Sequence, residues 1–143
     1  MPSFVSKVTD LETLGPLIGV TLWPGPDARS ELSPCIDTIA QIDTSSPYTL
    51  IQEGLATALG LEPVQTVKLL TVTGMVRVRG CYVYRLTLEF PQHDASYAFG
   101  IFAVEVPWMV DEDNRVKCRI GRDVLQFGRL LYNGKDNIFS LSF

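Results

Sequence analysis

Two short runs of the sequence bring together residues that could do chemistry. The first, Gln41-Ile42-Asp43-Thr44-Ser45-Ser46, places one carboxylate at the end of an apolar segment and follows it with small hydroxyl residues. The second, Ile120-Gly121-Arg122-Asp123-Val124-Leu125, is a glycine turn between an apolar segment and a predicted short helix. A carboxylate can take a proton from water, and a carboxylic acid can protonate a leaving nitrogen. Two carboxyl groups placed side by side share one proton, because like charges resist joint ionisation. Such a pair could hydrolyse a peptide bond.

The Asp-Thr dipeptide alone has almost no specificity, because the sequence contains it twice. Asp37-Thr38 precedes Asp43-Thr44 by six residues. Asp37 lies inside a predicted strand and is followed by bulky Ile39, which would obstruct a turn where two chains meet. Asp43 comes at the end of that strand, and only small residues follow it at once. The alternative is that Asp43 simply caps a turn or the next helix, as Asp, Ser and Thr commonly do.

Composition limits the classes of protein to consider. The chain has 143 residues, of which 46% are hydrophobic, enough for one domain with a substantial core. Its net charge of −4 argues against nucleic acid as a partner, since phosphate binding usually requires a basic surface. No apolar run approaches a membrane span, and the start Met1-Pro2-Ser3-Phe4 does not resemble a signal peptide. We therefore expect a cytoplasmic protein with no membrane or nucleic-acid partner.

Metal and cofactor chemistry find no support in the sequence. The three cysteines, Cys35, Cys81 and Cys118, are widely spaced and form no CxxC pair, so we expect reduced thiols packed as small apolar side chains. His93 is the only histidine, which excludes a histidine-rich metal site. It lies in a predicted loop, and no GxSxG, GxGxxG or Walker sequence occurs. We expect no metal and no organic cofactor.

Hydrophobic patterning predicts a mostly β chain with one or two short helices. The predicted strands cover residues 17–23, 35–42, 67–73, 76–78, 81–90, 97–106 and 138–143. Helical spacing of apolar residues predicts a helix within 49–61 that ends at Gly60, and a second at 124–127. Asn133-Gly134 predicts a hairpin turn with positive φ. Residues 1–16 are expected to form an N-terminal arm or short strand, and residues 17–143 a single domain.

The order of these parts resembles the retropepsin-like family, the single-domain aspartic proteases of retroviral type. Such domains usually show an apolar pair before Asp-Thr-Gly-Ala and another soon after it. They often continue with a helix ending in Leu-Gly-Leu, a glycine-containing hairpin, and an apolar-Gly-Arg-Asp/Asn-apolar-Leu run. The corresponding segments here are Gln41–Ser46 with Thr49–Ile51, Leu59–Leu61, Thr71–Gly80 and Ile120–Leu125. The resemblance covers roughly residues 17–143, and the last run is its most specific part.

The resemblance implies a fold, an activity and a set of site residues. The fold would be a closed β-barrel of retropepsin type, and the activity that of a homodimeric endopeptidase acting on peptides or proteins. Asp43 of each chain would be catalytic, with Thr44 and Ser45 supporting the loop around it. The remaining roles are a flap over the substrate, formed by Val72, Thr73, Gly74 and Met75, and structural support near the site from Gly121, Arg122 and Asp123.

Two departures from the family pattern bear on activity. Ser45 stands where the family usually has glycine, so a Cβ and a hydroxyl must fit beside the carboxylate. Pro47 lies where many viral members carry acidic residues that pair with the arginine of the Gly-Arg run, so Arg122 needs another partner or faces solvent. Asp123 is expected to cap the helix that follows it, and Gly121 to permit a close approach of two strands. The alternative function is a catalytically inactive module of the same fold, used for dimerisation or peptide binding.

Overall fold

The computed structural model describes residues 3–7, 11–25, 33–72, 76–91, 96–107 and 115–143. Within these ranges the chain forms ten strands and three one-turn helices. The strands are β1 (Ser3–Lys7), β2 (Leu17–Pro24), β3 (Ile36–Ile42), β4 (Leu50–Gln52), β5 (Gln65–Val72), β6 (Val76–Pro91), β7 (Ser96–Val106), β8 (Val116–Ile120), β9 (Arg129–Asn133) and β10 (Ile138–Ser142). The helices are α1 (Leu11–Leu14), α2 (Leu55–Ala58) and α3 (Arg122–Leu125). The mostly β class is confirmed, with one short helix, α1, more than the sequence predicted.

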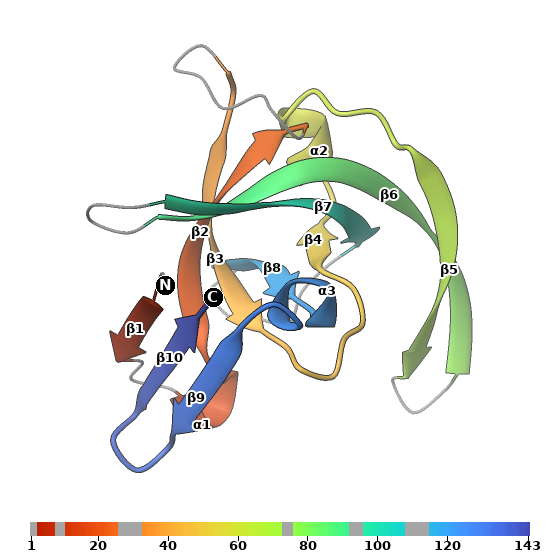
Figure 1. Ribbon diagram of the computed structural model, residues 1–143. Helices are drawn as coiled ribbons and strands as arrows, with labels where there is room; N and C mark the ends of the chain where they lie inside the picture. The colour runs from red at the N-terminus through yellow and green to blue at the C-terminus, as the bar shows by residue number, and fades with distance from the viewer. Residues whose placement is uncertain (1–2, 8–10, 26–32, 73–75, 92–95, 108–114) are drawn as a thin grey trace.

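Six of the strands close into a barrel. They are hydrogen-bonded in the order β2-β3-β8-β4-β7-β6, and an antiparallel pairing of β2 with β6 completes the ring. The long strand β6 arches across the barrel, and its first half pairs with β5, which continues the sheet outside the ring (Figure 1). The predicted closed barrel is therefore confirmed.

The path of the chain around β8 brings the two sequence runs together. β3 and β4 are consecutive strands, yet β8 lies between them, parallel to β3 and antiparallel to β4. The connection through residues 43–49 must therefore cross the carboxyl end of β8. That end is Ile120, which pairs with Ile42 and is followed at once by Gly121.

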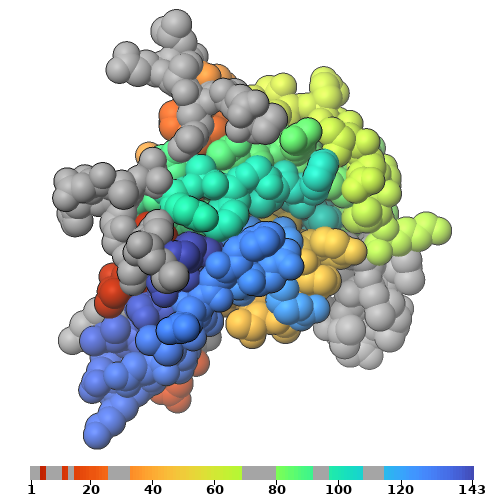
Figure 2. Space-filling model, viewed as in Figure 1, coloured from red at the N-terminus to blue at the C-terminus, as the bar shows by residue number. Residues whose placement is uncertain are grey.

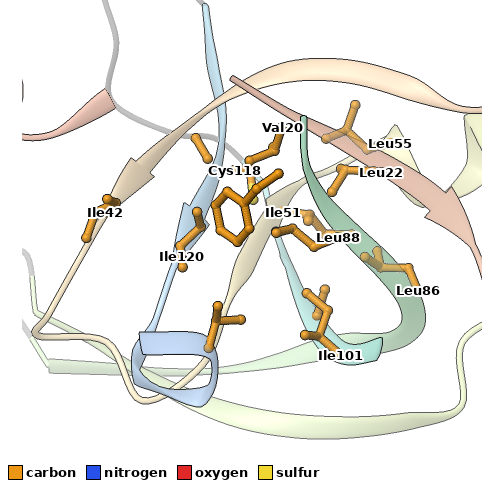
Figure 3. Packing of buried hydrophobic residues seen from close by; sticks show 14 of the residues in the cluster. Val20, Leu22, Ile42, Ile51, Leu55, Leu86, Leu88, Ile101, Cys118 and Ile120 are labelled. Atoms are coloured by element: carbon orange, nitrogen blue, oxygen red, sulfur yellow. The ribbon is translucent and has the colours of Figure 1, made fainter. Parts of the chain in front are cut away.

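Alternate residues of the barrel strands build the core. Ile42, Ile51 and Ile120 are buried and gather with side chains from β2 and β6 (Figure 3). Because successive side chains of a strand point to opposite faces, the residues between them, such as Gln41 and Arg119, face the outside of the barrel.

The N-terminal residues belong to a second, three-stranded sheet with the order β1-β10-β9. β1 pairs antiparallel with β10 from Ser3–Ser142 to Lys7–Ile138, so the predicted arm or short strand is a strand. Phe4 and Leu11 are buried in the same hydrophobic cluster as the barrel core. This sheet is therefore packed against the barrel.

The helix predicted within 49–61 is wrong in its first half. Residues 50–52 form β4, which pairs with β7 on one side and β8 on the other, and α2 begins only at Leu55. Tertiary pairing has overridden the helical spacing of the apolar residues. The predicted end is confirmed: Gly60 has φ +74°, its N–H donates to the Thr57 carbonyl, and the Leu61 N–H donates to the Ala56 carbonyl.

The predicted hairpin at Asn133-Gly134 is confirmed as the connection between β9 and β10, but its conformation differs. Asn133 pairs with Ile138, and the positive φ of the turn is at Asn137, with φ 55°, instead of at Gly134. The Asn133 side chain shapes the loop, since its Oδ1 accepts from the Asp136 N–H at 3.1 Å and its Nδ2 donates to the Asp136 carboxylate at 2.9 Å.

Candidate active site

Asp43 begins the turn that leaves β3. Its backbone N–H donates to the Ile120 carbonyl at 2.9 Å, and its own carbonyl accepts from the Ser46 N–H at 3.3 Å. Its side chain is half-buried, while Thr44 and Ser45 beside it are exposed. The turn is thus attached to the end of β8, and it presents its small residues at the surface.

Ser45 holds the Asp43 carboxylate. The Ser45 backbone N–H donates to Asp43 Oδ1 at 3.0 Å, and the Ser45 hydroxyl donates to the same oxygen. The serine that replaces the usual glycine therefore fits the turn and adds a donor that glycine lacks. Two hydrogen bonds to one oxygen restrict how the carboxylate can rotate.

Gly121 allows two backbones to touch. A Cβ at this position would lie 2.3 Å from the Tyr48 carbonyl oxygen and 2.8 Å from the Ser46 carbonyl oxygen. The φ of Gly121 is −97°, so close approach alone, and not a left-handed conformation, requires glycine here. The Arg122 N–H donates to the Ser46 carbonyl at 2.8 Å, so the loop after Asp43 lies directly on the Gly-Arg turn. The sequence led us to expect a close approach of two strands at Gly121, whereas the segment that approaches it is the loop after Asp43.

The Arg122 guanidinium has its partner in the Asp43 turn. Its Nη1 donates to the Thr44 carbonyl at 3.0 Å, although the side chain as a whole is exposed. A backbone carbonyl thus serves where a carboxylate would in many viral members. Figure 2 shows the gold surface of the segment around residues 40–50 directly beside the blue surface of the segment around residues 120–130.

Asp123 is not the cap that the sequence suggested. The N-cap residue of α3 is Gly121, and Asp123 lies one residue inside the helix, which begins at Arg122. Instead the Asp123 carboxylate accepts from the Thr49 N–H at 3.1 Å and from the Thr49 hydroxyl at 2.9 Å, as well as from the Val124 N–H. The Thr49 hydroxyl oxygen also accepts from the Gly121 N–H at 3.3 Å.

Thr49 is a site residue that the sequence analysis missed. It is fully buried, and it closes the loop that starts at Asp43 by joining it to the Gly-Arg turn. The sequence motif included Thr49 only as the polar residue before the apolar pair Leu50-Ile51, with no role assigned to its side chain. Asp123 and Thr49 therefore support the candidate site from behind, by joining the loop after Asp43 to the Gly-Arg turn.

The flap prediction is only partly within the described residues. β5 and β6 form an antiparallel hairpin, with Val72 paired to Val76 at its outer end. Thr73, Gly74 and Met75 lie outside the described residues. The predicted hairpin is therefore confirmed up to the Val72–Val76 pair.

The second dipeptide, Asp37-Thr38, lies inside β3 as the sequence indicated. Asp37 is opposite Thr21 of β2, and its exposed carboxylate accepts from the Thr21 hydroxyl at 2.6 Å. This is a cross-strand pair between a buried hydroxyl and an exposed carboxylate.

The cysteines differ from one another in burial. Cys81 and Cys118 are buried as small apolar side chains, but Cys35 is exposed, so the expectation of packing is wrong for it. Burial raises the pKa of the Cys118 thiol to about 12, and the Asp123 carboxylate acts in the same direction. In the described part of the chain no three Cys, His, Asp or Glu side chains gather as a metal site would require. His93 lies outside that part. None of the described helices is of the length and apolarity that a bilayer crossing demands.

No protein-family model matches the sequence, and no curated protein matches it. Among solved structures, a crystal structure of a retropepsin-like aspartic protease from Rickettsia conorii is similar. The identity is 13%, the TM-score is 0.48, and the match covers 99% of this chain and 94% of that chain. A likeness at this TM-score and identity carries no argument of its own, so the activity has to be inferred from the site itself. In its sequence motifs the chain resembles the retropepsin-like aspartic proteases, and the solved structure of one such protease is similar to it over 99% of its length.

Proposed function

We propose that the protein is a homodimeric aspartic endopeptidase in which Asp43 of each chain acts on one water molecule. The observation that carries the proposal is the attachment of the Asp43 turn to the Gly-Arg turn, through the Ile120 carbonyl, Arg122 and the close approach at Gly121. Such an arrangement fixes one carboxylate at the surface, among small exposed residues, where a second copy can meet it.

The proposed reaction needs both carboxylates. One, ionised, accepts a proton from the water as its oxygen attacks the peptide carbonyl carbon. The other, protonated, donates to the carbonyl oxygen, which gives a tetrahedral diol. As the C–N bond breaks, the first carboxyl gives the leaving nitrogen the proton that it took from the water, and a diol hydroxyl returns a proton to the second carboxylate. The hydrogen bonds from Ser45 to Asp43 Oδ1 would hold the carboxylate in the orientation for this transfer. The Thr44 hydroxyls of the two chains would hold the two turns in register.

The substrate is proposed to be an extended peptide. It would lie between the Asp43 turn and the β5–β6 hairpin, with residues 72–75 closing over it as a flap, and would bind as an added strand. In this proposal residues 17–143 are the catalytic domain and residues 1–16 an arm. The cytoplasm is the proposed compartment, in keeping with three cysteines that form no disulfide.

The test is cleavage of a peptide library by the wild-type protein and by Asp43→Asn. We expect the substitution to lower kcat/KM by about 10²–10⁴-fold, because an amide can neither accept nor donate the proton. Asp37→Asn is the matched control and should change kcat/KM by less than about twofold, as expected for an exposed side chain away from the turn. Sedimentation should find both variants as dimers, as we expect of the wild type. Cleavage by Asp43→Asn at the wild-type rate would contradict the proposal.

The second candidate function is an inactive module of this fold that dimerises or binds peptides. Ser45 favours it, because both of its donors engage the Asp43 oxygen that would otherwise be open to the water. A dimer that binds peptides from the library without cleaving them, and whose binding is unaffected by a pepstatin-like inhibitor, would establish this function instead.

A further inference from the structure

A continuous row of side chains crosses the outer face of the barrel next to the Asp43 turn. The strand register aligns Gln41 with Arg119, Arg119 with Leu50, Leu50 with Val104, and Val104 with Val83. Their neighbours along each strand, such as Ile42 and Ile120, point into the core. These five residues are called the outer row below, and they span β3, β8, β4, β7 and β6.

Arg119 is the one charged member of the outer row. Its Nε is buried, and no hydrogen-bond partner for it exists among the described residues. In the same part of the chain the guanidinium forms no ion pair. The guanidinium group is a hydrogen-bond donor with no acceptor atom of its own, so a buried N–H of this group without an acceptor is strongly unfavourable. The arrangement becomes favourable when a ligand supplies the missing acceptor.

The surroundings of Arg119 offer apolar contacts on one side. Val83 and Val104 are buried in a small cluster with Cys81, against which Leu50 and Val67 pack. None of these side chains can accept a hydrogen bond from a guanidinium strongly. A second unmatched polar atom lies on the same face, Oε1 of Gln52, two residues along β4 from Leu50. Among the described residues, the face therefore carries one buried donor and one buried acceptor without partners, as expected of a surface that binds a polar chain.

Arg119 lies close to the candidate catalytic carboxylate. Gln41, its partner in β3, precedes Asp43 by two residues, which in a strand is about 7 Å on the same face. The Asp43 N–H donates to the carbonyl of Ile120, the residue after Arg119. An extended peptide also advances about 7 Å in two residues. A substrate side chain within two residues of the bond at Asp43 would therefore come within reach of the guanidinium.

We propose that Arg119 selects peptides that carry Asp or Glu within about two residues of the bond at Asp43. The carboxylate of that side chain would accept from the guanidinium, the geometry for which arginine is best suited. The inference rests on the proposed function, because it assumes that a peptide lies across the Asp43 turn. It adds the chemical class of the preferred substrate.

The experiment separates binding from cleavage. Two nonapeptide libraries are made that differ only in the fixed fifth residue, Glu in one and Gln in the other, with all other positions randomised among residues other than Asp and Glu. Binding is measured by mass spectrometry on the dimeric Asp43→Asn protein, and cleavage on the wild type. We expect the Glu library to be favoured about tenfold or more in binding, as charge-assisted hydrogen bonds typically give.

Variants assign the preference to Arg119. Arg119→Gln should reduce the preference for Glu over Gln to about one, and Arg119→Glu should turn it toward a library with central Lys. Lys117→Gln is the matched control, because Lys117 lies on the same strand and face two residues earlier, and it should leave the preference in place. Circular dichroism checks that each variant is folded.

The outcomes are distinct for the two proposals. Equal binding of the Glu and Gln libraries to the Arg119-containing protein overturns the inference and needs no variant to do so. A Glu preference that survives Arg119→Gln overturns it as well. A Glu preference that depends on Arg119, in a wild-type protein that cleaves nothing, supports the inference and refutes the endopeptidase.

Discussion

The two Asp-Thr pairs of β3 are the same dipeptide in different surroundings. Asp37 lies in the first half of the strand, where its neighbours are β2 residues such as Thr21. Asp43 lies one residue beyond the other end. Besides the local bonds from Ser45 and Ser46, its turn is held by residues more than 70 positions later: the Ile120 carbonyl, which accepts from the Asp43 N–H, and the Arg122 side chain, which bonds to Thr44.

The two aspartates differ in whether β8 pairs with the part of β3 next to them. β8 pairs with residues 39–42 of β3 and stops at Ile120, so it flanks the Asp43 end of the strand and leaves the Asp37 level to β2. A surface carboxylate becomes a candidate for chemistry only where a second segment fixes the backbone around it. Disturbing that second segment should therefore affect Asp43 and leave Asp37 unchanged.

The largest effect is expected from Gly121→Ala. The new Cβ would collide with the backbone carbonyls of Tyr48 and Ser46, and backbone atoms cannot move aside as side chains do. We expect the free energy of unfolding to fall by about 3 kcal/mol, as for severe overpacking, and cleavage to be lost as the Asp43 turn shifts. Urea unfolding monitored by tryptophan fluorescence measures the first effect.

Gly19→Ala is the control for this substitution on the Asp37 side. Gly19 pairs with Ile39, next to Thr38, and no atom lies within 4 Å of the Cβ it would gain. Because alanine is about 0.5 kcal/mol better than glycine inside a strand, this variant should be slightly more stable than the wild type. Equal destabilisation by the two substitutions would show that the close approach at Gly121 is unimportant.

The next effect concerns the two threonine–aspartate pairs. Thr49→Val removes a fully buried hydroxyl and leaves the Asp123 carboxylate with one donor fewer, which should cost about 2 kcal/mol of unfolding free energy. Thr21→Val removes the donor to Asp37, but that carboxylate is exposed and can bond to water, so the cost should be about 0.5 kcal/mol. Denaturant midpoints of both variants test the difference. A larger loss for Thr21→Val would reverse the comparison.

From the sequence, the ends of strands could be predicted better than the distant residues that contact those ends. Asp43 was selected because small residues follow it at a strand end, and that is where it lies. The glycine at 121 was expected to permit a close approach, yet nothing in the sequence indicated that the Tyr48 carbonyl is what it contacts. Such contacts depend on the crossing of residues 43–49 over β8, which no local pattern encodes.

The same limit explains the two errors near the site. Leu50 and Ile51 have helical spacing with Leu55, but they pair with β7 and β8, so burial on both faces decides in favour of a strand. Asp123 has the position of a helix cap by local rules, but Thr49, 74 residues earlier in the chain, takes its carboxylate. Local propensity was overruled in both cases by partners distant in sequence.

The smallest effect concerns Cys118 of β8, which pairs with Ala40 between the two dipeptides. Its thiol has a pKa of about 12 in the folded chain, against 9.0 as the ordinary value. Between these values the folded state keeps a proton that the unfolded state has lost, so the free energy of unfolding falls as pH rises. From pH 8 to pH 10 the loss should be about 1.4 kcal/mol.

Cys118→Val should reduce this pH dependence by the Cys118 contribution, because valine has no proton to lose; burial also raises the pKa of Tyr84, whose smaller contribution in the same direction should persist. The measurement is the difference in unfolding free energy between pH 8 and pH 10 for the wild type and the variant. Cys35→Ala is the matched control: Cys35 is exposed and lies just before β3, so the wild-type pH dependence should persist in it. If Cys118→Val loses as much stability as the wild type over this range, the alkaline sensitivity does not come from β8. The alkaline sensitivity would then give no information about β8, the strand that pairs with β3 beside Asp43 and not beside Asp37.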